Sequence, residues 1–445
     1  MVFLARFPIV LLMLGLALAG FRFARALWGT GWLAFFFILF DPNILAHGRY
    51  ATTDVGGAFF GLLAVWAVWR LWQRSGWDWR RWGTAVLTLG LAFSAKLSIL
   101  AFAPMLALMA FLPQRDGFSW RGARRRLAQL ALAGVVSLLV VWAVFGFEWG
   151  VYHFASAGLA GWNGRSGPLP TFLAGIEQIA GLTGGGRGST FLLGRFSDSG
   201  FAAYFPVAFL VKTPLVTLLL LGTAVIVLLR NKETRGTAVF LLTPILLYFA
   251  LSMQSAFNIG YRHLLPVLPL VMVLIGGLVP RITHHASRIT YHVSRFAPLL
   301  LILTTLAIHP HYVSYFNLAA GGPANGYHIL VDSNVDWGQD LLRLRNWMNE
   351  NRVDSVKLAW FGTADPGYYG IRYEPLPGLG RSEFFLKWWD VPFDTQQPEP
   401  GVYAISVTNL WELPLQEAEK TRFAWFRAHE PDARVGYSIL IYRVE

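Results

Sequence analysis

The sequence contains no cysteine and little charge. Of its 445 residues, none is cysteine and 14% are charged. The missing cysteine excludes disulfides, thiolate catalysis and cysteine-ligated zinc, so any metal would be held by oxygen atoms or by histidine. Soluble globular proteins carry roughly 25% charged residues. The low charge therefore excludes an ordinary soluble enzyme.

The sequence is rich in apolar residues: 55% of its residues are hydrophobic and 15% are aromatic. Long apolar runs recur through residues 1–309, which predicts a mainly α, polytopic membrane domain there. The expected spans number about ten once the longest run is counted twice. They lie near 2–20, 26–40, 55–72, 83–112, 127–147, 206–229, 237–253, 264–280 and 296–309.

The run at 83–112 is the one expected to cross twice. As a single helix it would be about 45 Å long at 1.5 Å per residue, and Ser94, Lys96 and Ser98 interrupt its middle. We expect a turn near Lys96. The basic residues agree with this topology, because they then gather in the inside loops 21–25, 70–82, 113–126, 230–236 and 281–295. The amino terminus and the C-terminal domain are then predicted to lie outside.

Beyond residue 309 the composition changes to that of a small soluble α/β domain, predicted over 310–445. Turn residues separate a helix expected near 338–350 from strands expected at 357–361, 402–407 and 437–442. Acidic residues outnumber basic ones in this part, so the net charge of +12 arises in the membrane domain. A nucleic-acid partner is therefore excluded.

Acidic residues are scarce before residue 310, and two of them bracket one polar segment between apolar runs. Asp41 to Asp54 contains both carboxylates together with His47 and Arg49. Ionisable groups at membrane depth mark functional sites by default. The alternative is a turn in which Asp41 caps a helix that starts with Pro42, and a threonine before Asp54 caps the next helix. That alternative is favoured for Asp41, whereas Asp54 fits both interpretations.

Further cations lie at the predicted outer ends of the spans. Lys96 is at the turn described above, and Lys212 is expected about two turns into the span at 206–229. Arg262 and His263 are adjacent at the mouth of another span. Arginine and lysine suit a phosphate ligand, although snorkelling or interface anchoring would also explain them. The glycine-rich Gly184 to Gly188 run lacks the residues of a P-loop.

These polar clusters favour a reaction at the membrane surface on a lipid-linked phosphate. Transporters usually have polar or broken-helix sites near the midplane and repeated halves, and neither is evident in the sequence. A transporter is thus the weakest of the functional alternatives.

The stretches that hold these residues resemble a known family. They are Asp41 to Asp54, Gly90 to Ser98, Tyr204 to Pro214, Gly260 to Pro269 and Pro310 to Leu341. Their order is similar to that in polytopic GT-C glycosyltransferases of the protein O-mannosyltransferase superfamily, which depend on a phospholipid carrier. The resemblance implies inverting transfer of a mannose-like hexose from polyprenyl phosphate to an extracytoplasmic protein or envelope lipid. It also implies the plasma (inner) membrane.

The resemblance assigns roles residue by residue. Asp54 matches the second external acid of the family, which orients the acceptor or helps to bind a divalent metal, and His47 is the other metal candidate. Lys96, Lys212, Arg262 and His263 match positions around the lipid phosphate. Arg49 and Tyr204 lie in the same stretches and are further phosphate candidates.

The family's first helix and first external loop, which carry the usual catalytic base, have no counterpart in this sequence. The topology independently predicts a missing outward helix before Met1. A cleaved signal peptide ending at Ala17-Leu18-Ala19 is the alternative. If the base is absent, the chain would be a non-catalytic polyprenyl-phosphate-binding protein, or Asp54 would have to serve alone.

Overall fold

The computed structural model describes residues 2–74, 76–113, 117–186, 189–279, 288–376, 397–411 and 421–445. The chain forms two compact units, each discontinuous in sequence. The first comprises Met1–Thr183, Pro214–Gln254 and His263–Ala307; the second comprises Gly184–Thr213, Ser255–Arg262 and Ile308–Glu445. The second unit therefore includes two segments that precede the boundary predicted at residues 309 and 310.

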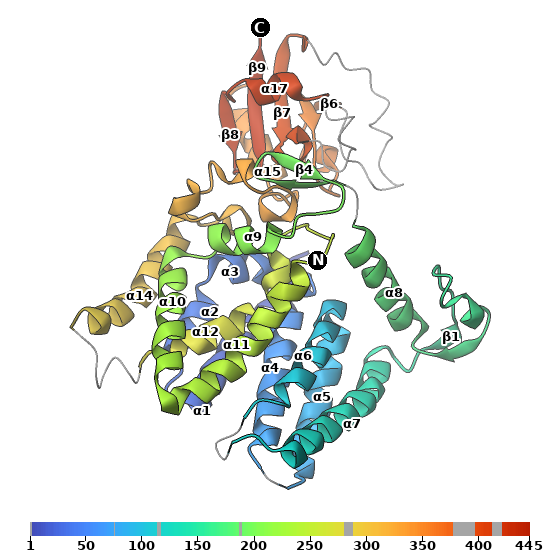
Figure 1. Cartoon of the computed structure of the whole chain (residues 1–445). Helices are drawn as coiled ribbons and strands as arrows, with labels where there is room; N and C mark the ends of the chain where they lie inside the picture. Colours follow the sequence, from blue (N-terminus) through green and yellow to red (C-terminus); the bar gives the residue numbers. More distant parts are fainter. Residues whose placement is uncertain are drawn as a thin grey trace. The chain divides into compact units, whose positions relative to one another are not determined.

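The first unit is built from helices, and it also contains one short hairpin (Figure 1). Its α-helices are α1 (Val2–Trp28), α2 (Trp32–Leu39), α3 (Pro42–Gly48), α4 (Asp54–Trp72), α5 (Trp79–Ala95), α6 (Phe102–Met109), α7 (Trp120–Val144), α8 (Pro170–Gly185), α10 (Leu215–Arg230), α11 (Lys232–Ser252), α12 (Leu268–Gly276) and α14 (Arg288–Ala307). The 3₁₀ helices η1 (Leu97–Ala101) and η2 (Ala160–Trp162) and the strands β1 (Trp149–Val151) and β2 (Ser166–Pro168) complete it.

Helix α12 forms the centre of this unit. All nine of its residues are buried, as expected for a helix that is apolar on every side. It packs against α1, α2, α10 and α11. The indole N–H of Trp28 donates a hydrogen bond of 2.8 Å to the carbonyl of Val273, which joins α1 to α12.

Several helices are long and apolar enough to cross a membrane, so the chain is an integral membrane protein. Within the described residues, Leu4–Trp28, Asp54–Trp72, Trp120–Val144 and Lys232–Ser252 qualify, with a fifth span if α9 (Tyr204–Lys212) and α10 are counted together. Leu97–Met109 and Phe296–Ala307 are shorter apolar helices. The ten predicted spans therefore do not all become long helices.

Two of the predicted runs show where sequence and structure differ. The first apolar run continues as helix through Arg22 and Arg25, where a loop was expected, and α1 ends at Trp28. The second run forms only the eight residues of α2. By contrast, the break at Lys96 is confirmed: α5 ends at Ala95, and Lys96 takes an extended conformation with φ −159° before η1 begins.

The second unit contains a five-stranded mixed sheet with the order β6-β5-β7-β9-β8. Strand β5 (Val356–Ala359) pairs in parallel with β6 (Tyr373–Pro375) and β7 (Gly401–Ser406), whereas β9 (Ile439–Val444) is antiparallel to β7 and β8 (Ala433–Val435). The three strands expected from the sequence are present as β5, β7 and β9. The second unit also contains α9, α15 (Leu341–Glu350), α16 (Val407–Leu410), α17 (Ala424–Ala428) and the hairpin of β3 (Thr190–Leu192) and β4 (Arg195–Ser197).

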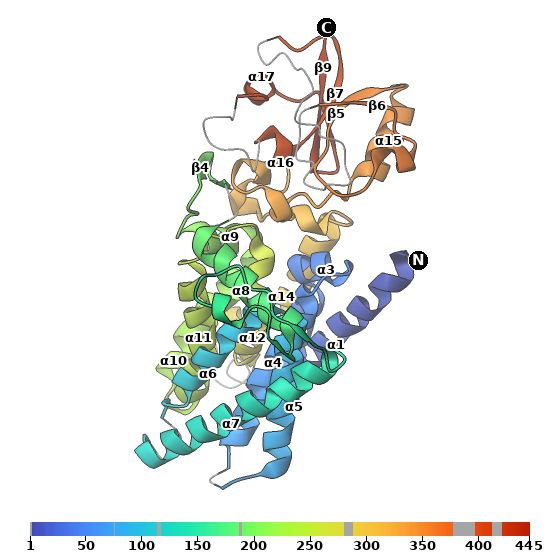
Figure 2. The ribbon, with the colours of Figure 1, turned by 90° about the vertical axis from the view of Figure 1, so that its right-hand side faces the viewer.

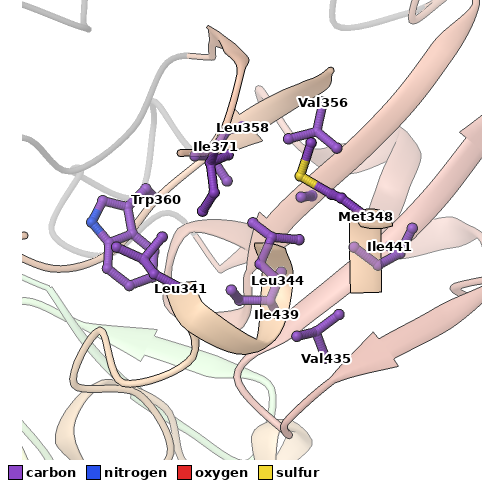
Figure 3. Packing of buried hydrophobic residues seen from close by; sticks show 11 residues of the cluster. Leu341, Leu344, Met348, Val356, Leu358, Trp360, Ile371, Val435, Ile439 and Ile441 are labelled. Carbon is purple, nitrogen blue, oxygen red and sulfur yellow. The ribbon is translucent and has the colours of Figure 1, made fainter. Parts of the chain in front are cut away.

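Helix α15 covers one face of the sheet (Figure 2). Leu341, Leu344 and Met348 are buried and follow the spacing of an amphipathic helix. They pack against Leu358, Ile439 and neighbouring sheet residues, as Figure 3 shows. The mainly helical fold with a small C-terminal α/β domain, predicted from the sequence, is confirmed.

Candidate functional site

The polar segment before α4 folds as two successive helix starts. Asp41 precedes α3 and accepts hydrogen bonds from the backbone N–H groups of Asn43 (2.9 Å) and Ile44 (3.0 Å). Pro42 occupies the first helical position, where its missing N–H costs nothing. The capping interpretation of Asp41 is therefore confirmed.

Asp54 is the first residue of α4 and is 2% exposed. Thr53 occupies the N-cap position without a side-chain capping bond. A carboxylate in the first turn of a helix interacts favourably with the N–H groups and the positive end of the helix dipole. The start of α4 is thus a suitable place to hold a buried negative charge.

Lys96 supplies the positive charge opposite Asp54. Its Nζ lies 2.7 Å from Oδ1 of Asp54, and both side chains are largely buried. The extended conformation of Lys96 between α5 and η1 turns its side chain toward α4. Removing one partner of a buried ion pair costs about 3–5 kcal/mol, because the other charge stays buried. Helices α4 and α5 pack against each other, and the charged pair joins the start of α4 to the residue that follows α5.

His47 is the third member of this cluster. Its Nδ1 lies 3.9 Å from Oδ2 of Asp54, and the residue is 4% exposed. The structure therefore brings together Asp54, Lys96 and His47 from α3, α4 and the α5–η1 junction. We call these three residues the Asp54 cluster.

Arg49 contacts the neighbouring aromatic side chain. Its Nη2 donates to the hydroxyl of Tyr50 at 2.9 Å, and its guanidinium lies 5.1 Å from the centre of that ring. Its assignment to a phosphate remains a prediction.

Lys212 is the last residue of α9, about two turns after this helix begins at Tyr204. Helix α9 ends at Lys212, because Thr213 is extended. Pro214 then occupies the N-cap position of α10. Lys212 is 3% exposed, and its Nζ donates to the carbonyls of Val313 (2.8 Å) and Asn334 (2.5 Å). The ammonium also lies 4.6 Å from the centre of the Phe316 ring. Within the second unit, these contacts anchor α9 to the segment that contains Val313 and Asn334.

Asn334 connects Tyr204 and Lys212, and sequence reasoning gave it no role. Its side chain donates 2.9 Å hydrogen bonds to the Tyr204 hydroxyl and the Val331 carbonyl, and accepts one of 2.9 Å from the backbone N–H of Tyr261. The residue is fully buried. Asn334 lies in the stretch from Pro310 to Leu341 that carries the family resemblance, and the dense polar residues from Asp332 to Asp340 were the signal that could have drawn attention to it.

Arg262 and His263 lie on opposite sides of the division between the units, and each is described within its own unit. The guanidinium of Arg262 stacks on the Trp337 ring, 5.0 Å from its centre. The backbone carbonyl of His263 accepts a 2.8 Å hydrogen bond from the Tyr248 hydroxyl. Their predicted roles at a phosphate remain predictions.

The same polar stretch contains a buried acid with unusual protonation. Asp336 is fully buried and accepts hydrogen bonds from the Ser406 hydroxyl and, at 3.0 Å, from the N–H of Gly338. Burial raises the pKa of Asp336 to about 8, and the nearby Asp340 and Asp332 add to the rise. Asp340 in turn bonds Arg343 and Ser438.

The Asp54 cluster offers two metal-ligating side chains, Asp54 and His47. Among the described residues, no group of three or more His, Cys, Asp or Glu side chains is placed to hold a metal ion. The Lys96 ammonium already lies on one Asp54 oxygen. These residues do not form a metal site on their own, so we derive no chemical step through a metal.

The chain thus combines a helical membrane unit with a small mixed-sheet unit. No protein-family model matches the sequence, and no curated protein matches it. Among solved structures it is similar in fold to ArnT from Cupriavidus metallidurans, determined bound to undecaprenyl phosphate. The match has 13% sequence identity and a TM-score of 0.45, and it covers 98% of this chain and 83% of that one. Because both measures are low, the function has to be argued from this chain's own residues.

Proposed function

We propose that this protein is a GT-C-type membrane glycosyltransferase that moves a mannose-like hexose from polyprenyl phosphate to an extracytoplasmic protein or envelope lipid. The observation that carries the proposal is the Asp54 cluster, a buried carboxylate with a cation at 2.7 Å and a histidine at 3.9 Å. In a membrane domain, buried ionisable groups on facing helices mark a functional site. The motif resemblance supplies the substrate class, the inner membrane and the external side.

The reaction requires few groups from the protein. The acceptor hydroxyl oxygen attacks the anomeric carbon, the bond from that carbon to the phosphate oxygen breaks, and polyprenyl phosphate departs with the bonding electrons. The hydroxyl proton passes to a base, and the configuration at the carbon inverts. A base must lie within about 3 Å of the hydroxyl, and cations stabilise the charge that develops on the phosphate.

The Asp54 cluster contains both kinds of group. We assign Asp54 to orient the acceptor hydroxyl and to accept its proton, and Lys96 to the departing phosphate. An ammonium has three N–H donors, and one of those on Lys96 is directed at Asp54. Arg49, Tyr204, Lys212, Arg262 and His263 are retained as proposed phosphate ligands, with Lys212 the weakest because two carbonyls already surround its ammonium.

The experiment compares two acids from the same segment. Asp54→Asn should reduce sugar transfer by about 100-fold or more, the usual contribution of a positioned acid or base. Asp41→Asn is the matched control, because asparagine caps a helix as well as aspartate and the variant should keep transfer. The assay follows polyprenyl phosphate released from polyprenyl-phosphate mannose, with serine- and threonine-containing peptides and envelope lipids as acceptors. Unchanged transfer by folded Asp54→Asn protein would refute the assigned role.

A second function is favoured by one feature of the cluster. Asp54 is held between a lysine and a histidine, which suits a permanent countercharge as well as a base. The chain would then bind polyprenyl phosphate without transferring sugar. Saturable binding of undecaprenyl phosphate that requires Lys96, with no release of polyprenyl phosphate from any donor, would support this function over the enzyme.

A further inference from the structure

An apolar groove lies outside the Asp54 cluster, in the segment that follows α7. It has a volume of about 870 Å³, within the range of small-molecule sites. Helix α8 forms one wall, and the chain from Tyr152 to Trp162 forms the other. Figure 1 shows α8 and β1 in this part of the first unit. The lining includes the side chains of Tyr152, Trp162, Leu173, Ala174, Glu177 and Gln178.

One face of α8 packs against the rest of the first unit, and the opposite face lines the groove. On the inner face, Phe172 is buried with its ring 5.7 Å from that of Phe145, and Gly175 lies against Leu97 of η1. A β-carbon at position 175 would come within 2.7 Å of the Leu97 side chain. The opposite face, with Leu173 and Ala174, lines the groove. The helix is thus fixed to the membrane unit and presents an apolar surface outward.

One carboxylate holds the two walls together. Glu177 accepts hydrogen bonds from the backbone N–H groups of Ala155 (3.1 Å) and Ser156 (2.7 Å) in the opposite wall. The side chain of Ser156, and after it the backbone N–H groups of Ser156 and Ala155, lower the pKa of Glu177 by hydrogen bonding to its charged form. The acid is therefore occupied as a brace, and the rest of the lining is chiefly hydrocarbon and aromatic.

The rim adds one positive charge. The guanidinium of Arg165 lies 5.5 Å from the centre of the Trp162 ring. Tyr152 also stacks on Phe154, with ring centres 5.8 Å apart. An apolar groove with an arginine beside its aromatic edge suits a ligand that has a hydrocarbon chain and an anionic head.

The segment that forms the groove follows α7 in the chain. That helix qualifies as a span and exposes Leu132, Val135, Leu139 and Val144. Immediately after it, Phe147 and Trp149 are each 62% exposed. Aromatic residues at the end of a span are typical of the membrane–water interface. Chain connectivity therefore puts the groove next to the outer end of α7, where bilayer lipids are the abundant apolar ligands.

We propose that this groove binds an acyl chain of a bilayer phospholipid, with the lipid phosphate against Arg165. The segment from Phe147 to Gly185 would then lie on the membrane surface and hold the external loop at a fixed depth. This inference depends on the membrane unit and its groove, and it does not depend on the proposed transferase activity.

The absence of cysteine makes a direct test simple. Gln178→Cys puts one thiol at the groove rim, and Thr183→Cys puts one on the same helix outside the lining. Each full-length variant is labelled with a small fluorophore and reconstituted into phosphatidylglycerol–phosphatidylcholine vesicles. Two vesicle preparations are compared: one contains lipids with brominated acyl chains, and the other contains the same lipids without bromine. Label 178 should lose more than half of its fluorescence with brominated chains, and label 183 should lose little.

Filling the groove is the second arm. Ala174→Trp added to Gln178→Cys should restore the fluorescence, whereas Ala174→Ser, the small control, should not. Arg165→Gln should weaken quenching in the anionic vesicles. Quenching of label 178 by aqueous iodide but not by brominated chains would overturn the proposal. Loss of chain quenching on adding a small amount of undecaprenyl phosphate would also overturn it, because the occupant would then be a polyprenyl chain.

Discussion

Gly57 leaves room for the side chain of Lys96. A β-carbon at position 57 would lie 2.9 Å from Cβ of Lys96 and 3.1 Å from its Cδ. Gly57 is three residues after Asp54, so the two share a face of α4. The lysine stem therefore passes over a bare stretch of helix backbone before its ammonium reaches the carboxylate.

Gly57→Ala should displace Lys96 and weaken its pairing with Asp54. The control is Gly56→Ala, because a β-carbon there would meet its nearest neighbour at 3.7 Å. Both changes replace a helical glycine by alanine, and this replacement by itself stabilises the folded protein by about 0.5–1 kcal/mol. Thermal unfolding should therefore show a gain for Gly56→Ala and a smaller gain or a loss for Gly57→Ala.

A double-mutant cycle identifies the cause. If Gly57 acts through Lys96, Gly57→Ala should reduce undecaprenyl phosphate binding in the wild-type background and change nothing in a Lys96→Ala background. Equal effects in both backgrounds would contradict this coupling. The unfolding measurements remain informative even if the chain binds no polyprenyl phosphate at all.

Lys212→Met should destabilise the protein. The change removes the donor to the buried carbonyls of Val313 and Asn334, and each unsatisfied group costs about 1–3 kcal/mol. Lys232→Met, at an exposed helix start, is the control and should leave the melting temperature almost unchanged. If Lys212→Met melts normally but no longer binds undecaprenyl phosphate, the anchoring role is wrong and the phosphate role is supported.

Asn334→Ala should destabilise the second unit through a different set of bonds. It removes the side-chain contacts with Tyr204, Val331 and the N–H of Tyr261 while leaving the backbone carbonyl that Lys212 uses. The melting temperature should fall by several degrees, since buried groups lose their partners. Asn346→Ala, on exposed α15 surface, provides the comparison. An unchanged melting temperature would show that Asn334 is not a structural node.

Local patterns in the sequence predicted much of the fold. The three strands, the helix expected near 338–350 and the cap at Asp41 depend on neighbouring residues, and all are confirmed, with the helix beginning at Leu341. The break at Lys96 was also predictable, because polar residues interrupt an apolar run. These features have a short range along the chain, which is why composition and spacing suffice to find them.

Long-range contacts were not predictable in the same way. Lys212 bonds carbonyls 101 and 122 residues away, and Asn334 bonds Tyr204 across 130 residues. A lysine beside an apolar run has the same local sequence whether it holds a phosphate or two backbone carbonyls. The need for a glycine at position 57 likewise depends on how closely the Lys96 side chain approaches α4. The sequence of α4 alone does not reveal that approach.

Asp336 should make the free energy of unfolding depend on pH between about 4 and 8. Its folded-state pKa of about 8 lies above the usual value of 3.8, because burial disfavours the charged form. Between these two values the folded state binds the proton and the unfolded state does not. The free energy of unfolding should therefore decrease as pH rises from about 4 toward 8, with no further contribution from this group at higher pH.

Asp336→Asn tests this directly, since an amide mimics the protonated carboxyl and can keep bonds to Ser406 and the N–H of Gly338. The variant should melt like the wild type near pH 5 and at a higher temperature near pH 9. Asp340→Asn is the contrasting change: it removes the carboxylate that pairs with Arg343, so it should lower the melting temperature at both pH values. If the wild type and Asp336→Asn show the same pH dependence, the buried carboxyl is not protonated in the folded protein.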